Sequence, residues 1–321
     1  GMFKNVMVYR IGEGWSPSLG DVESALQGER FEECGATQDK SVGWAEPRGQ
    51  EHGPLVESVG GQWIAKLVIE SKAVPGNVVR KKLDEQVAEI EAATGRKPGK
   101  KEKRNMQDEI LLDLLPQAFA RQSSVLVWLD MKARRLVLNA GSQGKADEAV
   151  SALLKAMPGL NIALLQTTTT PQAAMTEWLL AHQPEDWPAD LCVERECTLK
   201  ATGEDAASIR YVRHHLANDE VRKHVTEGKL PTQLALSWDG RVAFVLTETL
   251  QLKKVQFLDG VMDATGTDKD EDRFDADVAL STGLLAPLLD SLIAALGGEM
   301  EWGAAAASTE AAPAAADDPP F

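Results

Sequence analysis

The chain has 321 residues and a formal net charge of −15, and 43% of its residues are hydrophobic. This length allows a substantial core in two or three subdomains, whereas the acidic excess argues against a protein that attracts nucleic acid over its whole surface, because phosphates require positive charge. The three cysteines, Cys34, Cys192 and Cys197, are odd in number and lack CxxC spacing, so neither a disulfide framework nor a zinc site is expected.

The sequence shows no targeting segment. The N-terminal stretch FKNVMVYRIG lacks the continuous apolar core and the small-residue cleavage site of a signal peptide. No later window reads as a continuous run of about 18 apolar residues, the length that indicates a membrane-spanning helix. We therefore expect a cytoplasmic protein without a membrane partner.

Residues 2–75 are expected to form the N-terminal part of an α+β body. Alternating or β-branched apolar residues predict strands at 3–11 and 62–70. A short helix is predicted at 20–26. No repeat with a period of 20–50 residues is visible here or later in the chain, which excludes solenoids and propellers.

Residues 76–122 are predicted to form a projecting helical hairpin. Apolar residues recur every three or four positions in 78–93 and again in 105–119, as in two amphipathic helices. The stretch between them, GRKPGKKEKR (95–104), carries six basic residues and one Glu, and its Gly and Pro residues break helical structure. The hairpin therefore has a basic tip, which either binds an anionic partner or is a solvated surface.

Residues 123–302 are expected to complete the body with a second sheet. Strands are predicted at 124–130, 135–140, 161–166, 191–200, 207–213 and 250–257. A hairpin is predicted within TQLALSWDGRVAFVLTE, because Asp239-Gly240 supplies the positive φ angles of a type I′ turn. Helices are predicted at 146–157, 172–181, 219–227 and 282–296, the last with Ser281 or Thr282 as its N-cap. This order of elements predicts an α+β fold with mixed, largely antiparallel sheets.

Charge is unevenly distributed along the chain. The segment 259–277 contributes −6 and the segment 299–321 contributes −5, which leaves −4 for the rest of the chain. Local basic surfaces are therefore compatible with the acidic total. Residues 303–321 are rich in Ala and Pro and lack periodic apolar residues, so we expect this tail to be disordered.

The acidic segment DKDEDRFDAD (268–277) is the one candidate metal site. It fails the EF-hand pattern, because Arg273 occupies the Gly position and Ala279 the position of the terminal Glu. A two-metal hydrolytic site would require further carboxylates from elsewhere. The sequence also lacks GxSxG, P-loop, HExxH and GxGxxG motifs. We expect no enzyme and no cofactor, with a metal-dependent nuclease that uses Asp268–Asp277 as the alternative.

A second basic stretch, SIRYVRHHL, covers residues 208–216. In a strand, Ile209, Tyr211 and Arg213 would share one face, and Arg210 and His214 would not join them. The pattern alone indicates a solvated sheet edge.

Six segments carry a resemblance to a known family. In chain order they are FKNVMVYR, CGATQDKSVGW, EKRNMQDEILLDLLPQAFAR, MTEWL, LALSW and RFDADVALSTGLLAPLLDSLIAALGGE, and they extend from residue 3 to residue 299. They resemble the recombination-associated RdgC family of proteobacteria. The resemblance implies a ring-shaped homodimer that binds duplex DNA with little sequence preference, associates with the nucleoid and restrains RecA-promoted recombination. A ring can be acidic outside and basic inside, so net charge is a poor guide to the potential near DNA.

The resemblance also implies site residues. Phe119, in LLPQAFAR, matches the family's dimer contact; the alternative is a Phe buried in its own subunit. Gln117 stands where the family has a basic residue, which removes one phosphate contact. The resemblance places Arg210, Arg213 and His214 near the DNA path. Together with the basic residues of the hairpin, they make up the expected DNA-binding residues: Lys81, Lys82, Lys97, Lys100, Lys101, Lys103, Arg104, Arg121, Arg210, Arg213 and His214. A rival hypothesis is a protein that inhibits recombinase by direct contact.

Overall fold

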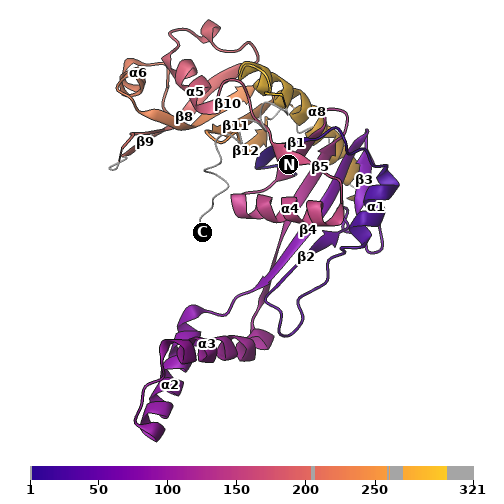
Figure 1. Ribbon diagram of the computed structural model, residues 1–321. Coiled ribbons are helices and arrows are strands. Elements are labelled where there is room, and N and C mark those ends of the chain that lie inside the picture. The colour runs from indigo at the N-terminus through magenta and orange to yellow at the C-terminus, as the bar shows by residue number, and fades with distance from the viewer. Residues whose placement is uncertain (1, 204–206, 259, 261–269, 302–321) are drawn as a thin grey trace.

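The computed structural model describes residues 2–203, 207–258, 260 and 270–301, shown in Figure 1. The strands are β1 (Val6–Ile11), β2 (Lys40–Ala45), β3 (Val56–Val59), β4 (Gln62–Lys72), β5 (Ala120–Asp130), β6 (Arg135–Asn139), β7 (Ile162–Leu164), β8 (Leu191–Lys200), β9 (Ser208–Val212), β10 (Leu230–Trp238), β11 (Val242–Thr247) and β12 (Leu252–Phe257). The helices are α1 (Leu19–Gln27), α2 (Gly76–Thr94), α3 (Lys100–Leu114), α4 (Gln143–Ala156), α5 (Pro171–Leu180), α6 (Asp219–Thr226) and α8 (Asp270–Ala295), with short 3-10 helices η1 (Leu115–Gln117) and η2 (Pro184–Asp186).

The strands form one 12-stranded sheet in the order β2-β4-β5-β6-β1-β12-β11-β10-β8-β9, with β3 added to β4 and β7 to β1. The pairings between these strands are antiparallel, which confirms the α+β class. The expected second sheet is instead a continuation of the first. It is joined through β1 and β12 at a single aligned pair, Val6 with Leu252.

The strands before this junction, β1–β7, form the N-half of the sheet, and both of its faces are covered. Alternate residues of β1, β5 and β6, such as Met7, Val127 and Leu138, pack in one hydrophobic cluster with residues of α1 and α4. The intervening residues, such as Val8 and Trp128, point to the other face and pack in a second cluster, which includes residues of α8. This period of two is the signature of a strand buried on both faces.

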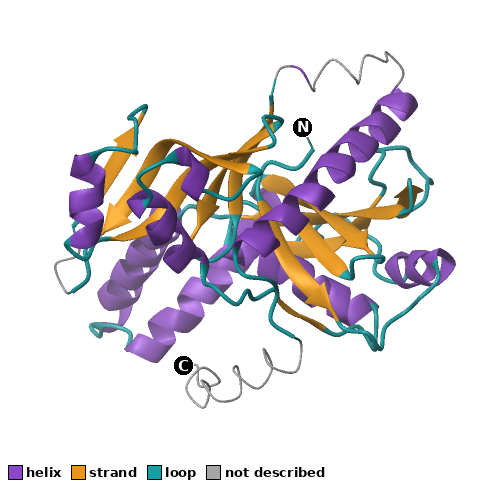
Figure 2. Cartoon of the chain, turned by 90° about the horizontal axis from the view of Figure 1, so that it is seen from above, coloured by secondary structure: helices purple, strands orange, loops and turns teal. Residues whose placement is uncertain are grey.

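The strands after the junction, β8–β12, form the C-half, and helices cover one of its faces. Leu236 and Phe244 pack in the same cluster as residues of α5, α6 and α8. Figure 1 shows these helices on the outer side of the strands, while the opposite sheet face is turned toward the hollow of the molecule. Figure 2, seen from above, shows α8 crossing the chain between the two groups of strands.

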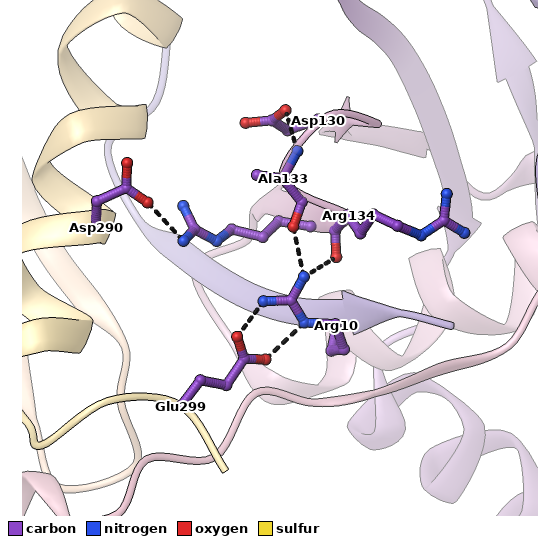
Figure 3. Close-up of polar contacts among 7 residues, drawn as sticks. Arg10, Asp130, Ala133, Arg134, Asp290 and Glu299 are labelled. Atoms are coloured by element: carbon purple, nitrogen blue, oxygen red, sulfur yellow. Dashed lines mark hydrogen bonds and ion pairs between the residues drawn. The ribbon is translucent and has the colours of Figure 1, made fainter. Parts of the chain in front are cut away.

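Helix α8 is held to the N-half by three arginines. Near its start, Arg48 Nη2 lies 2.6 Å from Asp275 Oδ1 and the guanidinium stacks on the Phe274 ring at 4.6 Å. Farther along, Arg135 Nη2 lies 2.6 Å from Asp290 Oδ1. Just beyond the helix, Arg10 pairs with Glu299 through two hydrogen bonds and also donates to two backbone carbonyls (Figure 3).

The start of α8 corrects the sequence prediction. The helix begins at Asp270, twelve residues before the predicted start, so Ser281 and Thr282 are interior residues and not N-caps. Both are buried, and the Thr282 hydroxyl donates to the carbonyl of Val278 at 2.7 Å. Residues 270–277 of the acidic segment therefore belong to this helix.

By length and composition, residues Arg273–Ala295 of α8 could cross a membrane, with a mean hydropathy of 1.7. A core helix meets the same criterion. Leu284, Leu288 and Leu292 recur at a spacing of four and are buried in the cluster that joins α8 to the sheet. This packing accounts for the apolar composition of α8 by its place in the core.

The structure contains two strands that the sequence did not predict, β2 and β3, both paired with β4. It also confirms the predicted tight turn, in which Asp239 has φ 50° and Gly240 has φ 63°. The Arg241 amide donates to the Trp238 carbonyl at 2.9 Å across this turn. The turn therefore fixes the register of β10 against β11.

Candidate nucleic-acid interface

The helical hairpin formed by α2, α3 and the loop between them is called the arm. It stands on the extended ends of β4 and β5, which remain paired as far as Lys72 and Ala120, and it projects away from the body (Figure 1). Gly95 ends α2 with φ 70°, a left-handed conformation that glycine adopts without strain. Gly99, in an extended conformation, precedes the first residue of α3. The arm is therefore a pair of helices joined by a short loop.

The basic stretch is more helical than predicted. Helix α3 begins at Lys100, five residues before the predicted start, so four of the predicted DNA-binding residues lie in its first five positions: Lys100, Lys101, Lys103 and Arg104. Cations at a helix N-terminus oppose the helix dipole and therefore do not stabilise the helix. Binding of an external anion explains these charges better than helix stability does. Because positions three and four apart share a helix face, Lys100, Lys103 and Arg104 point in a common direction.

The other predicted cations of the arm are distributed along its length. Lys97 lies in the loop and is exposed, whereas Lys81 and Lys82 are exposed in the second turn of α2. At 1.5 Å per residue, about 20 Å of helix separates Lys81 and Lys82 from the loop. Arg121 is exposed near the start of β5, opposite Ser71. Among the ion pairs between described residues, none includes the predicted basic residues of the arm.

Phe119 is 94% exposed and lies between η1 and β5, where the chain leaves the arm. The alternative of a Phe buried in its own subunit is therefore wrong. Leu115 fills that role and is buried at 8% exposure, while Leu112 of α3 is 51% exposed. The root of the arm thus presents two large apolar side chains to solvent.

A second candidate surface is the sheet face of the C-half that the described helices leave uncovered, called the open face. It includes residues Cys192, Glu194, Glu196, Thr198 and Lys200 of β8, Arg210 of β9, Ala235 and Ser237 of β10, Ala243 of β11, and Lys253, Lys254 and Gln256 of β12. Many of their neighbours, such as Leu199, Tyr211, Leu236 and Phe244, are buried on the other face. The small residues Ala235, Ser237 and Ala243 lie on the central strands, and the long charged residues lie on the outer ones.

A β-bulge places two lysines on this face. The register of β11 against β12 shifts between Ala243 and Val245, and Lys254 has φ 52°. An extra residue in one strand lets two consecutive side chains avoid the buried face. Lys253 and Lys254 therefore both project from β12 between the buried Leu252 and Val255.

Two carboxylates of β8 organise the polar groups of the open face. Glu196 Oε1 accepts from Arg210 Nη2 at 2.8 Å and from Lys254 Nζ at 3.3 Å. The hydrogen bond from Arg210 is the main cause that lowers the pKa of Glu196 below its ordinary value. Glu194 accepts from the Ser237 hydroxyl at 2.8 Å. The predicted residue Arg210 is thus paired within the protein.

Arg213 and His214 follow β9 and do not continue its alternation. Tyr211 is buried, but Arg213 has φ 56° and is exposed, so the expectation that Arg213 shares the face of Tyr211 is wrong. The left-handed residue turns the chain out of the strand. The His214 ring then lies 5.0 Å from the Tyr211 ring and its amide donates to the Arg195 carbonyl.

The acidic segment 268–277 falls partly outside the described residues. Asp275 and Asp277 lie on α8, and side chains two positions apart on a helix do not face each other. Asp275 is engaged by Arg48. Among the described residues, no group of three or more His, Cys, Asp or Glu side chains could hold a metal ion.

Sequence reasoning missed Lys200, Lys253 and Lys254. The signal for the lysine pair was present in QLKKVQF, where two adjacent lysines interrupt an otherwise alternating strand. Such an interruption is typical of a bulge. Nothing in the sequence indicated that Lys254 and Arg210 meet at one carboxylate, because their strands are separated in the sheet by β11, β10 and β8.

Comparison with known proteins gave consistent matches over nearly the whole chain. A family model described as "Putative exonuclease, RdgC" matches residues 2–299. The recombination-associated protein RdgC of Dechloromonas aromatica is 38% identical over 303 residues, which cover 93% of this chain and 98% of that protein. The proteins of the same name from Janthinobacterium sp. (strain Marseille) and Cupriavidus pinatubonensis are 39% and 40% identical, over 93% and 92% of this chain and 99% and 98% of theirs.

Proposed function

Because the chain belongs to the RdgC family of recombination-associated proteins, we propose that it binds duplex DNA through the phosphate backbone as a ring-shaped homodimer. In this proposal it acts in the cytoplasm, on the nucleoid, and limits recombination by occupying DNA that RecA filaments would use. It needs no cofactor and cleaves no bond.

The observation that carries the proposal is the pairing of a basic arm with an open sheet face on one hollow side of the chain. The arm and the β9 end of the sheet are the two ends of an arc in Figure 1. Exposed Lys100, Lys101, Lys103 and Arg104 lie on the arm, Arg210 lies on β9 at the other end, and Lys254 lies on the open face between them, on β12. Cations on both ends of an arc can contact the backbone of a duplex lying between them. Two arcs joined end to end would enclose the duplex.

Phe119 supports the homodimer. Its side chain is 94% exposed, and exposed Leu112 adds a second apolar side chain at the root of the arm. Aromatic residues are the commonest anchors of protein interfaces. We assign the partner as a second copy of the chain because the family resemblance matches Phe119 to the dimer contact.

The proposal is tested by the salt dependence of DNA binding. If phosphates supply the affinity, the logarithm of the binding constant falls linearly with the logarithm of salt concentration, at about 0.9 per phosphate neutralised. Duplexes of one length and unrelated sequence should bind with similar constants at each salt concentration. A preference above about a thousandfold, which is typical of sequence-specific proteins, would contradict the proposal.

The word exonuclease in the family description favours a second candidate, a metal-dependent nuclease that uses Asp268–Asp277. It predicts magnesium-dependent degradation of linear duplex by purified protein, abolished by Asp275→Asn and Asp277→Asn. A third candidate, inhibition of RecA by direct contact, predicts that the two proteins associate in extracts treated with nuclease. Our proposal predicts neither result.

A further inference from the structure

We infer that Glu196 stands in for a DNA phosphate on the open face: it holds Arg210 and Lys254 together as a phosphate site and yields both cations to the backbone of bound DNA. The inference rests on the proposed function and adds a positioning residue to it. Glu196 would set how strongly, and with what salt dependence, this part of the chain binds DNA.

The geometry of the three side chains carries the inference. Arg210 Nη2 and Lys254 Nζ lie 2.8 Å and 3.3 Å from the same oxygen, Oε1 of Glu196. They reach it from β9 and β12, on opposite sides of β8, β10 and β11 in the sheet order. Two cations that share one oxygen repel each other and stay together only while an anion lies between them. In the absence of DNA, Glu196 is that anion.

The site is built so that another anion can replace the carboxylate. The side chains of Arg210 and Lys254 are 60% and 64% exposed, whereas that of Glu196 is 23% exposed, so the cations form the outer layer and the carboxylate the floor. Exposed ion pairs are weak, because water competes for both partners. A phosphate oxygen accepts the same charge-assisted hydrogen bonds as a carboxylate oxygen. The exchange needs only side-chain rotation.

The backbone around Lys254 supports the same conclusion. Lys254 occupies a left-handed conformation, φ 52°, at the bulge of β12. A non-glycine residue in this region is under conformational strain, which persists where the surrounding structure demands it. Here the strained bulge brings the Lys254 ammonium over the sheet to Glu196.

The charge of the cluster predicts a measurable effect. Arg210, Lys254 and Glu196 together carry +1, and replacing Glu196 by Gln raises this to +2. One more phosphate can then be neutralised per chain, so the salt slope should become steeper by about 0.9 for each chain, or about 1.8 for the dimer. Between 50 and 200 mM salt this corresponds to an additional loss of affinity of about 3.5-fold for each chain, or about twelvefold for the dimer, and the variant should bind more tightly than wild type at the lower concentration.

The chain offers a matched control. Glu194 lies two residues earlier on the same face of β8, but its carboxylate accepts from Ser237 and not from a cation. Glu194→Gln removes the same charge without releasing Arg210 or Lys254. It should therefore raise affinity less than Glu196→Gln and leave the slope near that of wild type.

The experiment is fluorescence anisotropy on one labelled duplex with full-length protein. It compares wild type, Glu196→Gln, Glu194→Gln, a double variant with Arg210→Gln and Lys254→Gln, and a triple variant that adds Glu196→Gln to this double variant. We expect Glu196→Gln to bind more tightly with the steeper slope, and we expect that gain to vanish in the triple variant. Thermal melts identify a misfolded protein, and Glu196→Thr replaces Glu196→Gln if that variant does not fold.

Two results would overturn the inference while leaving the proposed function intact. One is wild-type affinity and slope in Glu196→Gln although the wild type binds DNA. The other is weaker binding by Glu196→Gln, which would show that the carboxylate is needed to position the cations when DNA is bound. If wild type shows no salt-dependent binding to duplex, the proposed function itself fails.

Discussion

The arm and the open face both present cations, but in the part of the chain that the structure describes the cations of the arm are unpaired and two of those on the open face are paired with a carboxylate. On the arm, the basic residues at the start of α3 have no ion-pair partner among the described residues, and they lie where the helix dipole disfavours them. On the open face, Arg210 and Lys254 are both paired with Glu196. Unpaired cations give attraction over a distance, whereas paired cations exchange one anion for another only on contact. The comparison teaches that total charge does not measure how strongly a surface binds DNA.

The largest expected effect comes from removing the unpaired cations. Replacing Lys100, Lys101 and Lys103 together by Gln should make the salt slope shallower by up to about 2.7 for each chain, which is about fortyfold per chain in affinity change between 50 and 200 mM salt. The melting temperature should change little, because all three residues are exposed. Anisotropy titrations at several salt concentrations measure the slope.

The control for the triple variant is Lys132→Gln. Lys132 is exposed just after β5, at the end of that strand farthest from the arm. Its replacement should leave the slope close to that of wild type. An unchanged slope in the triple variant would show that these lysines do not contact DNA and that the arm is only a solvated surface.

The next largest effect concerns the apolar root of the arm. Phe119→Ala should weaken dimerisation by about thirtyfold, since truncating an interface anchor commonly costs about 2 kcal/mol. Because the side chain is 94% exposed in the single chain, the monomer should stay folded with an unchanged melting temperature. Sedimentation velocity over a range of concentrations measures the dissociation constant.

Leu154→Ala is the matched control for Phe119→Ala. Leu154, on α4, is 44% exposed and lies outside the arm, so its truncation should not change the dimer. Equal dimerisation of wild type and Phe119→Ala would remove Phe119 from the interface. Retention on closed circular compared with linear DNA then tests whether the dimer encloses the duplex.

The smallest effect is a difference in thiol reactivity between the two faces of the C-half. Cys192 is exposed and lies opposite Ser237 on the open face, whereas Cys197 is buried and its burial raises the pKa to about 12. Of these two cysteines, only Cys192 should react readily with iodoacetamide at neutral pH, because the thiolate is the nucleophile. Saturating duplex DNA should slow that reaction several-fold, as mass spectrometry of the modified peptides would show. Equal rates with and without DNA would mean that DNA does not cover this part of the open face.

Much of the fold could be predicted from local pattern. Apolar runs and alternation identified β8, β10 and β11. Asp239-Gly240 identified the tight turn between β10 and β11, because few residue pairs tolerate two positive φ angles. The pattern failed for β2, whose sequence KSVGWA has little alternation and becomes a strand by pairing with β4. Long-range pairing of this kind leaves little trace in a single segment.

The candidate site was predicted unevenly for the same reason. The charges of GRKPGKKEKR are adjacent in sequence, so the arm could be found without a structure. The pairing of Lys254 with Glu196 joins residues 58 positions apart and depends on a bulge. The exposure of Phe119 also could not be read from the sequence, because an amphipathic helix with several leucines gives no sign of which apolar side chains remain outside the core.

Helix α8 determines which part of a proposed dimer of these chains could open. The two halves of the sheet share one aligned residue pair, yet α8 packs against both and is tied to the N-half by Arg48 and Arg135. Bending the chain at the junction would peel buried leucines from one half, at about 1.5–3 kcal/mol for each. Each chain should therefore resist bending at this junction. If two such chains form the proposed ring, the ring would open for DNA by separating the contact at the arm. The strength of that contact, more than bending within either chain, would then set the rate of loading.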